Sequence, residues 1–138
     1  MSRILSTLDL QNASRCIMNT VDTSLWTCVI PAAGEGTRLA YSHPKVLYPI
    51  LGKPILYHLL GLFKKYCNRF IVVASPKGAQ EIKSELESFC NSIDFGIVIQ
   101  EDPKGMAHAV WQARDIINTP HTVVVWGDQI CLRDETIS

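Results

Sequence analysis

Four runs of apolar, often β-branched residues alternate along the chain with segments in which apolar residues recur at helical spacing. The runs are continuous and occupy 26–30, 70–74, 95–99 and 121–126. The helical spacing extends over 54–66, 82–90 and 106–117. Continuous apolar strands between helices are typical of a parallel sheet that helices cover on both faces. The order βαβαβαβ therefore predicts a doubly wound α/β fold with a mostly parallel sheet and right-handed crossovers.

The chain changes character at residue 25. Residues 1–25 are polar and mixed, with scattered Ile, Leu and Met, and we expect them to form a leader outside the main core. The regular pattern starts at Trp26, so 26–138 is predicted to form the domain. Pro54 suits the first position of the first helix, where its missing N–H is not needed. Trp111 and Trp126 are interpreted as packing residues.

Composition and charge exclude several classes of partner. Of the 138 residues, 47% are hydrophobic, and thirteen basic side chains balance thirteen acidic ones. A neutral chain has no field to attract a polyanion, which argues against nucleic acid as a partner. No apolar run approaches the roughly 18 residues of a membrane span, and no signal-peptide pattern occurs. We therefore expect no membrane partner and a cytoplasmic location.

The cysteines form neither a zinc pattern nor a disulfide framework. Their number is odd, and no CxxC pair occurs, whereas such sites need closer or even pairing. We interpret them as small apolar core fillers in a reducing compartment. They are Cys16, Cys28, Cys67, Cys90 and Cys131.

Small and charged residues gather directly after the predicted strands. Ligands of open α/β sheets bind outside the carboxyl ends of the strands, so these segments form the candidate site. In the first of them, small residues would let backbone N–H groups approach an anion, and Arg38 adds a planar fork for phosphate oxygens. The segments are 31–39, 75–78, 100–105 and 127–129.

The first loop fits neither of two common phosphate-binding patterns. No Gly-Lys-Ser/Thr ends it, which excludes the Walker pattern, and Leu39 stands where the dinucleotide pattern has its third Gly. Arg38 and the downstream Pro44-Lys45 nevertheless favour phosphate binding over plain turn chemistry.

Several motifs, in the right order, resemble the sugar-phosphate nucleotidyltransferases. The run 32–39 contains a GxGTR loop like that of the family, and Pro44-Lys45 follows it closely as the family's Pro-Lys does. The segments Val46-Leu47-Tyr48-Pro49 and Gly52-Lys53-Pro54 continue the resemblance.

Two later stretches carry the same resemblance. Gln100 with 105–110 looks like the base-recognition segment, most like that of the N-acetylglucosamine-1-phosphate uridylyltransferases. The run 123–128 looks like the strand that carries the metal-binding Asp. The resemblance spans about 26–138 and implies a Rossmann-like nucleotidyltransferase fold.

The resemblance implies an enzyme of nucleotide-sugar biosynthesis, a nucleotidyltransferase of the pyrophosphorylase type. An oxygen of a sugar-1-phosphate would attack the α-phosphorus of a nucleoside triphosphate, with UTP favoured, and pyrophosphate would leave. Such chemistry depends on positioning and charge neutralisation. The implied partners are these two small molecules, and the implied cofactor is Mg²⁺.

The resemblance also assigns roles to single residues. Arg38 and Lys45 would be catalytic: Arg38 would hold the β- and γ-phosphates, and Lys45 would contact the α-phosphate or the incoming phosphate. Asp128 would bind Mg²⁺, the alternative being that its side chain caps the following turn. His108 receives no catalytic role. The amide of Gln100 would read the pyrimidine edge. The predicted nucleotide-binding residues are Ala32, Ala33, Gly34, Gly36, Thr37, Gln100 and Gly105.

Two departures from the family leave alternatives open. Met106-Ala107 stands where the most similar uridylyltransferases have Thr-Gly, so a cytidylyl or thymidylyl donor is an alternative. The chain ends ten residues after Asp128, and we expect a C-terminally truncated domain that has the nucleotide half without the sugar half. The alternatives to transfer are a nucleotide-binding module and an inactive remnant. An uncovered sheet edge also favours self-association into a homo-oligomer.

Overall fold

The structure, a computed structural model, describes residues 21–34, 41–89, 93–102, 104–133 and 135. Most of the expected leader lies outside these residues. The end of the leader forms a short 3₁₀ helix, η1 (Thr23–Leu25), and the carboxylate of Asp22 caps it by accepting the Ser24 N–H at 3.1 Å. Among the helices of the described residues, none has the length and apolar character to cross a membrane.

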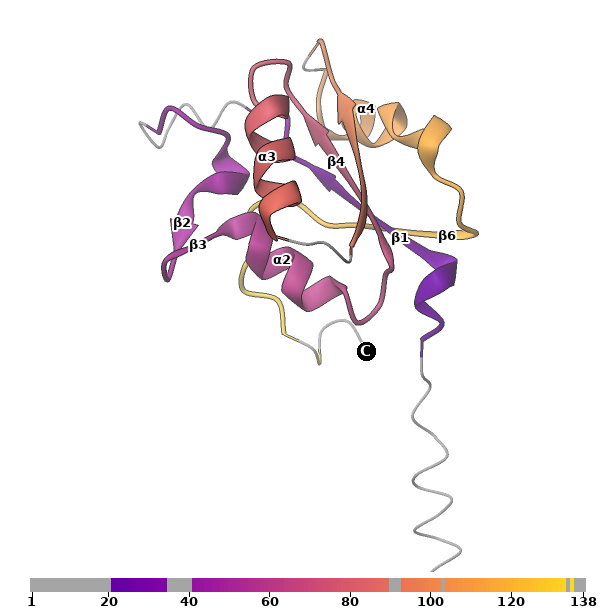
Figure 1. The fold of residues 1–138 in the computed structure, drawn as a ribbon. Helices are drawn as coiled ribbons and strands as arrows, with labels where there is room; N and C mark the ends of the chain where they lie inside the picture. Colours follow the sequence, from indigo (N-terminus) through magenta and orange to yellow (C-terminus); the bar gives the residue numbers. More distant parts are fainter. Residues whose placement is uncertain (1–20, 35–40, 90–92, 103, 134, 136–138) are drawn as a thin grey trace, which may run out of the picture.

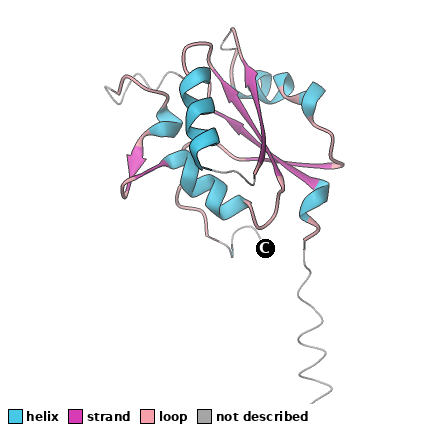
Figure 2. Cartoon of the chain, viewed as in Figure 1, coloured by secondary structure: helices cyan, strands magenta, loops and turns pink. Residues whose placement is uncertain are grey.

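A four-stranded parallel sheet forms the centre of the domain (Figures 1 and 2). From edge to edge, its strands are β5 (Asp94–Ile99), β4 (Arg69–Ala74), β1 (Trp26–Pro31) and β6 (His121–Val124). The chain adds β4 and β5 on one side of β1 and then crosses over to add β6 on the other side. This reversal makes the sheet doubly wound, so the fold class predicted from the sequence is confirmed.

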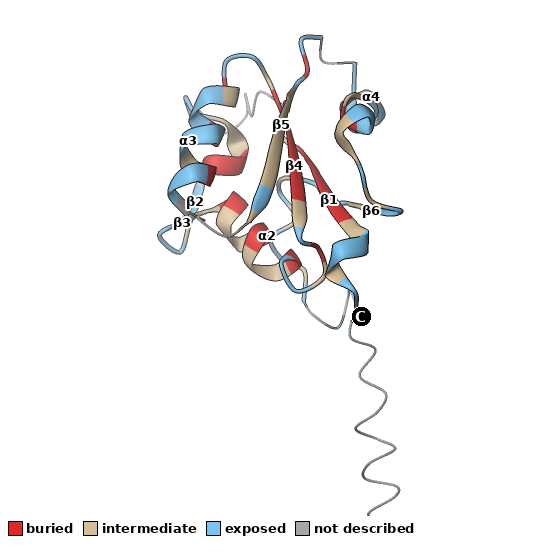
Figure 3. Ribbon diagram, turned by 45° about the vertical axis from the view of Figure 1, so that its right-hand side comes forward, coloured by how far each residue is buried: buried red, intermediate tan, exposed pale blue. Residues whose placement is uncertain are grey.

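Helices lie on both faces of the sheet (Figure 3). Helices α2 (Ile55–Phe63) and α3 (Ala79–Phe89) cover one face. The short helix α4 (Met106–Gln112) and the 3₁₀ turn η4 (Arg114–Ile116) cover the other face. The long apolar segment predicted over 106–117 is therefore two elements, with Ala113 as the residue between them.

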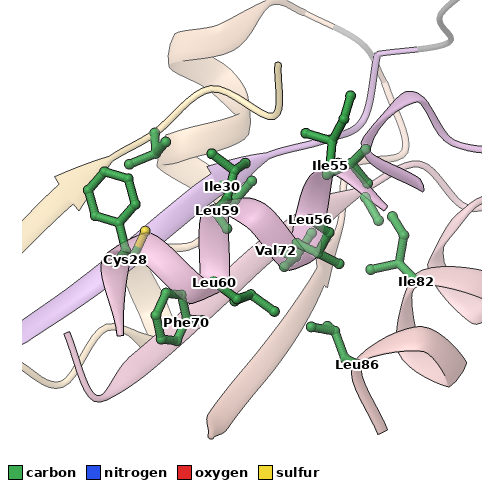
Figure 4. Packing of buried hydrophobic residues seen from close by; sticks show 14 of the residues in the cluster. Cys28, Ile30, Ile55, Leu56, Leu59, Leu60, Phe70, Val72, Ile82 and Leu86 are labelled. Atoms are coloured by element: carbon green, nitrogen blue, oxygen red, sulfur yellow. The ribbon is translucent and has the colours of Figure 1, made fainter. Parts of the chain in front are cut away.

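Successive side chains of the two central strands point to opposite faces and so create two core layers. One layer packs against α2 and α3 (Figure 4) and includes Cys28, Ile30, Leu56, Leu59, Leu60, Phe70, Val72, Ile82 and Leu86. The other layer packs against α4 and includes Val29, Ile71, Val73, Ala109 and Ala113. Because β1 and β4 are buried on both sides, their sequences are continuous runs of apolar residues.

The edge strands depart from the prediction of full burial. Ile99 at the end of β5 is 46% exposed, and Val124 at the end of β6 is 39% exposed. Strand β6 also ends at Val124, two residues earlier than its apolar run. Each edge strand has a neighbour on one side only, and α4 packs mainly over β1 and β4. Trp111 and Trp126, interpreted from the sequence as packing residues, are not buried: they are 63% and 49% exposed.

Two small elements between β1 and α2 were not expected from the pattern. A 3₁₀ turn, η3 (Lys45–Leu47), precedes a hairpin of β2 (Pro49–Ile50) and β3 (Lys53–Pro54). The two residues of its turn, Leu51 and Gly52, have φ angles of 49° and 77°. Positive φ at both positions matches the twist of the paired strands. Helix α2 begins at Ile55, so Pro54 precedes it instead of filling its first position.

Two cysteines are core residues, as expected. Cys28 and Cys67 carry free thiols and are 0% and 1% exposed. The hydrogen bond with the Cys67 thiol, followed by burial, raises the pKa of the Cys28 thiol well above its usual value. Cys131 is exposed, and the other two cysteines lie outside the described residues.

Two leucines that are near in sequence give a direct test of the core. Leu56 is 0% exposed between α2 and the sheet, whereas Leu51 in the hairpin turn is 93% exposed. We expect Leu56→Ala to lower the free energy of unfolding by about 2–5 kcal/mol, because it removes buried methyl groups and leaves a cavity. Leu51→Ala should change it by less than about 0.5 kcal/mol. Urea unfolding followed by circular dichroism measures both, and equal effects would contradict this packing.

Candidate functional site

A cavity of about 280 Å³ opens at the carboxyl edge of the sheet, where β1 lies between β4 and β6. Segments that follow three different strands contribute its walls, together with η3 and the start of α4. This is the position in which doubly wound sheets bind ligands. Its lining consists of Pro31, Ala32, Ala33, Gly34, Lys45, Val46, Gln100, Gly105, Met106, Ala109, Trp126, Gly127 and Asp128.

The structure brings the described residues with a predicted binding or catalytic role together in this one cavity, whereas the candidate segment 75–78 does not contribute to its lining. Lys45, Gln100 and Asp128 line it although long stretches of sequence separate them, and the small residues 32–34 lie beside them. Gly105 contributes from the loop before α4. The other three candidates, Gly36, Thr37 and Arg38, lie outside the described residues.

Hydrogen bonds that continue beyond the regular sheet hold the loops around β1. The Ala32 N–H donates to the Val73 carbonyl at 2.7 Å, and the Val125 N–H donates to the Val29 carbonyl at 2.9 Å. Gly127 then passes close to β1, because a Cβ atom on it would lie 3.3 Å from the Pro31 carbonyl oxygen. The absence of a side chain at Gly127 thus places Asp128 next to the first loop.

Lys45 reaches the site from a firmly held segment. The next two residues in η3, Val46 and Leu47, are 2% and 8% exposed and belong to the core. On the other side, Pro44 packs against the turn after β4 so tightly that a Cβ atom on Gly78 would lie 2.7 Å from its Cγ. The backbone at Lys45 is therefore fixed, while its side chain extends into the cavity.

Lys45 and Asp128, predicted as a catalytic residue and a metal ligand, form an ion pair. The Lys45 Nζ donates to the Asp128 Oδ2 at 2.6 Å. Both side chains are about half exposed, at 40% and 50%, so the pair faces solvent in the cavity. A solvent-exposed pair of this kind contributes at most about 1 kcal/mol to stability. The two groups can therefore exchange partners at small cost when a charged ligand enters.

The alternative that Asp128 caps the following turn does not describe this structure. The turn is closed by the side chain of Gln129, whose Oε1 accepts the Trp126 N–H at 3.1 Å, and by backbone bonds. The carboxylate of Asp128 instead bonds to Lys45. This role of Gln129 was not predicted from the sequence. The turn-forming residues Gly127-Asp128 before it could have indicated a turn here.

The donor groups fit a magnesium ion that arrives with a triphosphate better than a resident metal. Among the described residues, Asp128 is the one carboxylate in the cavity lining, and no three His, Cys, Asp or Glu side chains form a cluster suited to a metal. Mg²⁺ commonly takes one or two protein carboxylates and fills its other positions with phosphate oxygens and water. Asp128 with a bound triphosphate meets this requirement.

A chain of polar groups lies beside the cavity. Gln100, which follows β5, is 4% exposed, and its backbone N–H donates to the Ala74 carbonyl at 2.9 Å. Its side-chain Nε2 lies 2.7 Å from His108 Nδ1 and 3.4 Å from the Gly105 carbonyl oxygen. The other ring nitrogen of His108 lies 3.0 Å from the amide of Gln112. His108 thus has a structural link to the site that the sequence reasoning did not assign.

Comparison with known proteins agrees with this geometry. The chain is 36% identical over 102 residues to the bifunctional protein GlmU of Gluconacetobacter diazotrophicus, covering 74% of this chain and 21% of the relative. It is 38% identical over 111 residues to the GlmU of Thermodesulfovibrio yellowstonii, covering 79% of this chain and 23% of the relative. The chain therefore spans about a quarter or less of the length of these curated relatives.

Solved structures share the fold. A UDP-glucose pyrophosphorylase complexed with UDP-glucose matches with a TM-score of 0.69 and 21% identity, over 79% of this chain and 48% of that one. HddC from Yersinia pseudotuberculosis, complexed with GMP-PN, matches with a TM-score of 0.67 and 30% identity, over 80% of this chain and 51% of that one.

The family model extends over nearly the whole described domain. The model for the MobA-like NTP transferase domain matches residues 28–138. The match begins at Cys28 within β1 and includes all the segments that line the cavity. The resemblance to nucleotidyltransferases that the sequence motifs indicated is thereby confirmed. With the doubly wound sheet, the cavity at its carboxyl edge and this match in agreement, the chain belongs to the MobA-like NTP transferase domain family.

Proposed function

We propose that this chain binds a pyrimidine nucleoside triphosphate as its magnesium complex and takes part in transfer of the nucleoside monophosphate to a sugar-1-phosphate. The observation that carries the proposal is the meeting of four kinds of group in one cavity. Small residues for backbone N–H contacts, a lysine, a carboxylate and a buried amide all line it. Each matches a different part of a magnesium–nucleotide complex.

The transfer step follows ordinary phosphoryl chemistry. An oxygen of the acceptor phosphate forms a bond to the α-phosphorus, the bond from that phosphorus to the bridging oxygen breaks, and pyrophosphate leaves with the electron pair. Lys45 would neutralise charge at the α-phosphate or the incoming phosphate, and Arg38 would hold the leaving pyrophosphate. Mg²⁺, when bound with the triphosphate at Asp128, supplies further neutralisation of phosphate charge.

When a magnesium triphosphate binds, Lys45 and Asp128 can each exchange the other for a group of the ligand. In the structure the ammonium group of Lys45 donates a hydrogen bond to the Asp128 carboxylate, the group that would bind the metal. A magnesium triphosphate offers a cation to Asp128 and phosphate oxygens to Lys45 at the same time. Both charges keep an opposite partner through this exchange, so neither is left unpaired in the partly enclosed cavity.

UTP is the proposed donor, and the residues rather than the structural likenesses support it. Solved structures of similar fold include a UDP-glucose pyrophosphorylase, an inositol-1-phosphate CTP transferase and a complex with GMP-PN, so the fold accommodates several bases. In this chain Gln100, the residue predicted to read the base, is buried and lines the cavity. An amide beside a pyrimidine edge can act as donor or acceptor, and its orientation decides the preference.

Titration calorimetry with UTP and Mg²⁺ tests nucleotide binding and the role of Lys45. We expect Lys45→Met to weaken binding by roughly ten- to hundredfold, because a charge-assisted hydrogen bond to phosphate contributes about 1.5–3 kcal/mol. Lys53→Met, a change in the exposed hairpin strand β3, is the matched control and should bind like the unaltered chain. The nucleotide-site proposal is rejected if the unaltered chain binds no nucleotide at millimolar concentration.

The same titration with and without magnesium tests Asp128. Asp128→Asn should bind UTP more tightly than the unaltered chain when Mg²⁺ is absent, since the change frees Lys45 and removes a negative charge. The gain on adding Mg²⁺ should fall about tenfold or more, because the metal loses its protein carboxylate. Asp115→Asn, on an exposed turn where Asp115 pairs with Arg114, serves as the control. An undiminished magnesium gain in Asp128→Asn would remove Asp128 from the metal site.

Release of pyrophosphate separates transfer from binding alone. If the chain transfers, release from UTP should depend on an added sugar-1-phosphate and on both Lys45 and Asp128. The alternative is a nucleotide-binding module that does not carry out transfer. Tight binding of UTP without acceptor-dependent release in a coupled phosphate assay would favour that module.

A further inference from the structure

The polar groups around His108 form a chain whose donors and acceptors must alternate. A neutral imidazole carries one N–H donor and one acceptor nitrogen. His108 has an amide at each nitrogen: that of Gln100 at 2.7 Å from Nδ1 and that of Gln112 at 3.0 Å from Nε2. One amide must therefore present its NH₂ to the ring and the other must present its oxygen.

A backbone carbonyl decides which of the two arrangements holds. The same Gln100 atom that faces His108 Nδ1 also lies 3.4 Å from the Gly105 carbonyl oxygen. A carbonyl oxygen can only accept, so the Gln100 atom between them must be the NH₂ group. His108 Nδ1 is then an acceptor and its proton is on Nε2. Gln112, whose Nε2 lies 3.0 Å from His108 Nε2 in the structure, must therefore have its amide reversed so that its oxygen accepts from that N–H.

The arrangement leaves the oxygen of Gln100 for the ligand. Within the described residues no partner bonds to Gln100 Oε1, this oxygen is not among the fully buried unpaired atoms, and Gln100 lines the cavity. Rotating the amide by 180° would place the Gln100 oxygen against the Gly105 carbonyl oxygen, and this contact is what distinguishes the two arrangements. The cavity therefore meets a fixed hydrogen-bond acceptor at this point.

We infer that His108 is a positioning residue that locks the Gln100 amide with its oxygen toward the base and thereby selects a uracil-type edge. The inference rests on the proposed nucleotide site. Uracil carries a ring N3–H that donates to such an oxygen, whereas the N3 atom of cytosine is an acceptor and is repelled by it. His108 acts through Gln100 and does not itself touch the nucleotide. The base that the sequence left open between uracil, thymine and cytosine is thus narrowed to those with an N3–H.

The test compares UTP, CTP and N3-methyl-UTP in titrations with Mg²⁺. The unaltered chain should prefer UTP over both of the other nucleotides. His108→Leu removes the acceptor, frees the amide to rotate and should lower the UTP-to-CTP affinity ratio by about five- to tenfold, the range of one neutral hydrogen bond. The penalty for N3-methylation should shrink by a similar factor. His108→Asn, whose side-chain oxygen lies near the position of Nδ1, should restore part of the ratio.

His121→Leu is the matched control, since His121 is exposed on β6 and stacks on Trp26 away from the cavity. A general loss of structure would lower the affinities for UTP and CTP together and leave their ratio unchanged. If His108→Leu keeps its affinity for CTP but its UTP-to-CTP ratio stays within twofold of the unaltered value, the inference is overturned. A preference of the unaltered chain for CTP overturns it as well.

A spectroscopic measurement tests the lock without any nucleotide. In ¹⁵N NMR spectra of the unaltered chain, the His108 ring should show a protonated Nε2 and an unprotonated Nδ1 near neutral pH. The opposite tautomer would refute the fixed amide even if UTP binds. A chain with the expected tautomer that binds no nucleotide would instead refute the proposed function and leave the hydrogen-bond chain as described.

Discussion

The fold and the site both depend on the pairing of β1 with a parallel strand on each side. Its register with β4 and β6 places three strand ends at the same edge of the sheet. The ladder continues past the regular strands through Ala32 and Val125, whose N–H groups bond to the neighbouring strands. Because these bonds hold the loops as well as the sheet, burial of the central strands also positions the groups that line the cavity.

The cavity combines a rigid backbone with easily exchanged charges. The segments around Lys45 and Asp128 are anchored by buried residues and by the close approach of Gly127 to Pro31. The ion pair itself is half exposed and contributes little to stability. A fixed backbone at Lys45 and Asp128, together with a weak ion pair between their side chains, suits a site that must bind a highly charged ligand and release charged products.

The sequence predicted the parts that follow from local pattern and strand order. Continuous apolar runs identified β1 and β4, and the rule for strand ends predicted that the loop after β1, Gln100 and Asp128 share one edge. Lys45 was predicted from the Pro-Lys motif of the resembled family instead. The exposure of Trp126 could not be predicted, because it depends on how far α4 extends over the sheet. The hairpin was missed because Leu51-Gly52 has only one of the two glycine-type residues that signal such a turn. The hydrogen bonds of His108 were missed because they depend on α4 packing beside Gln100 at the end of β5. Helical spacing alone does not reveal that contact.

The participation of the Gly105 carbonyl has a consequence for how this site could change over evolution. Side chains can be exchanged by mutation, but a main-chain oxygen is present whichever amino acid occupies the position. Residue 105 has φ of 93° as the N-cap of α4, so the direction of that oxygen is tied to the backbone geometry of the loop. A lineage that altered its base preference would therefore have to reshape this loop or replace Gln100 and His108, rather than remove the group that sets the polarity of the network.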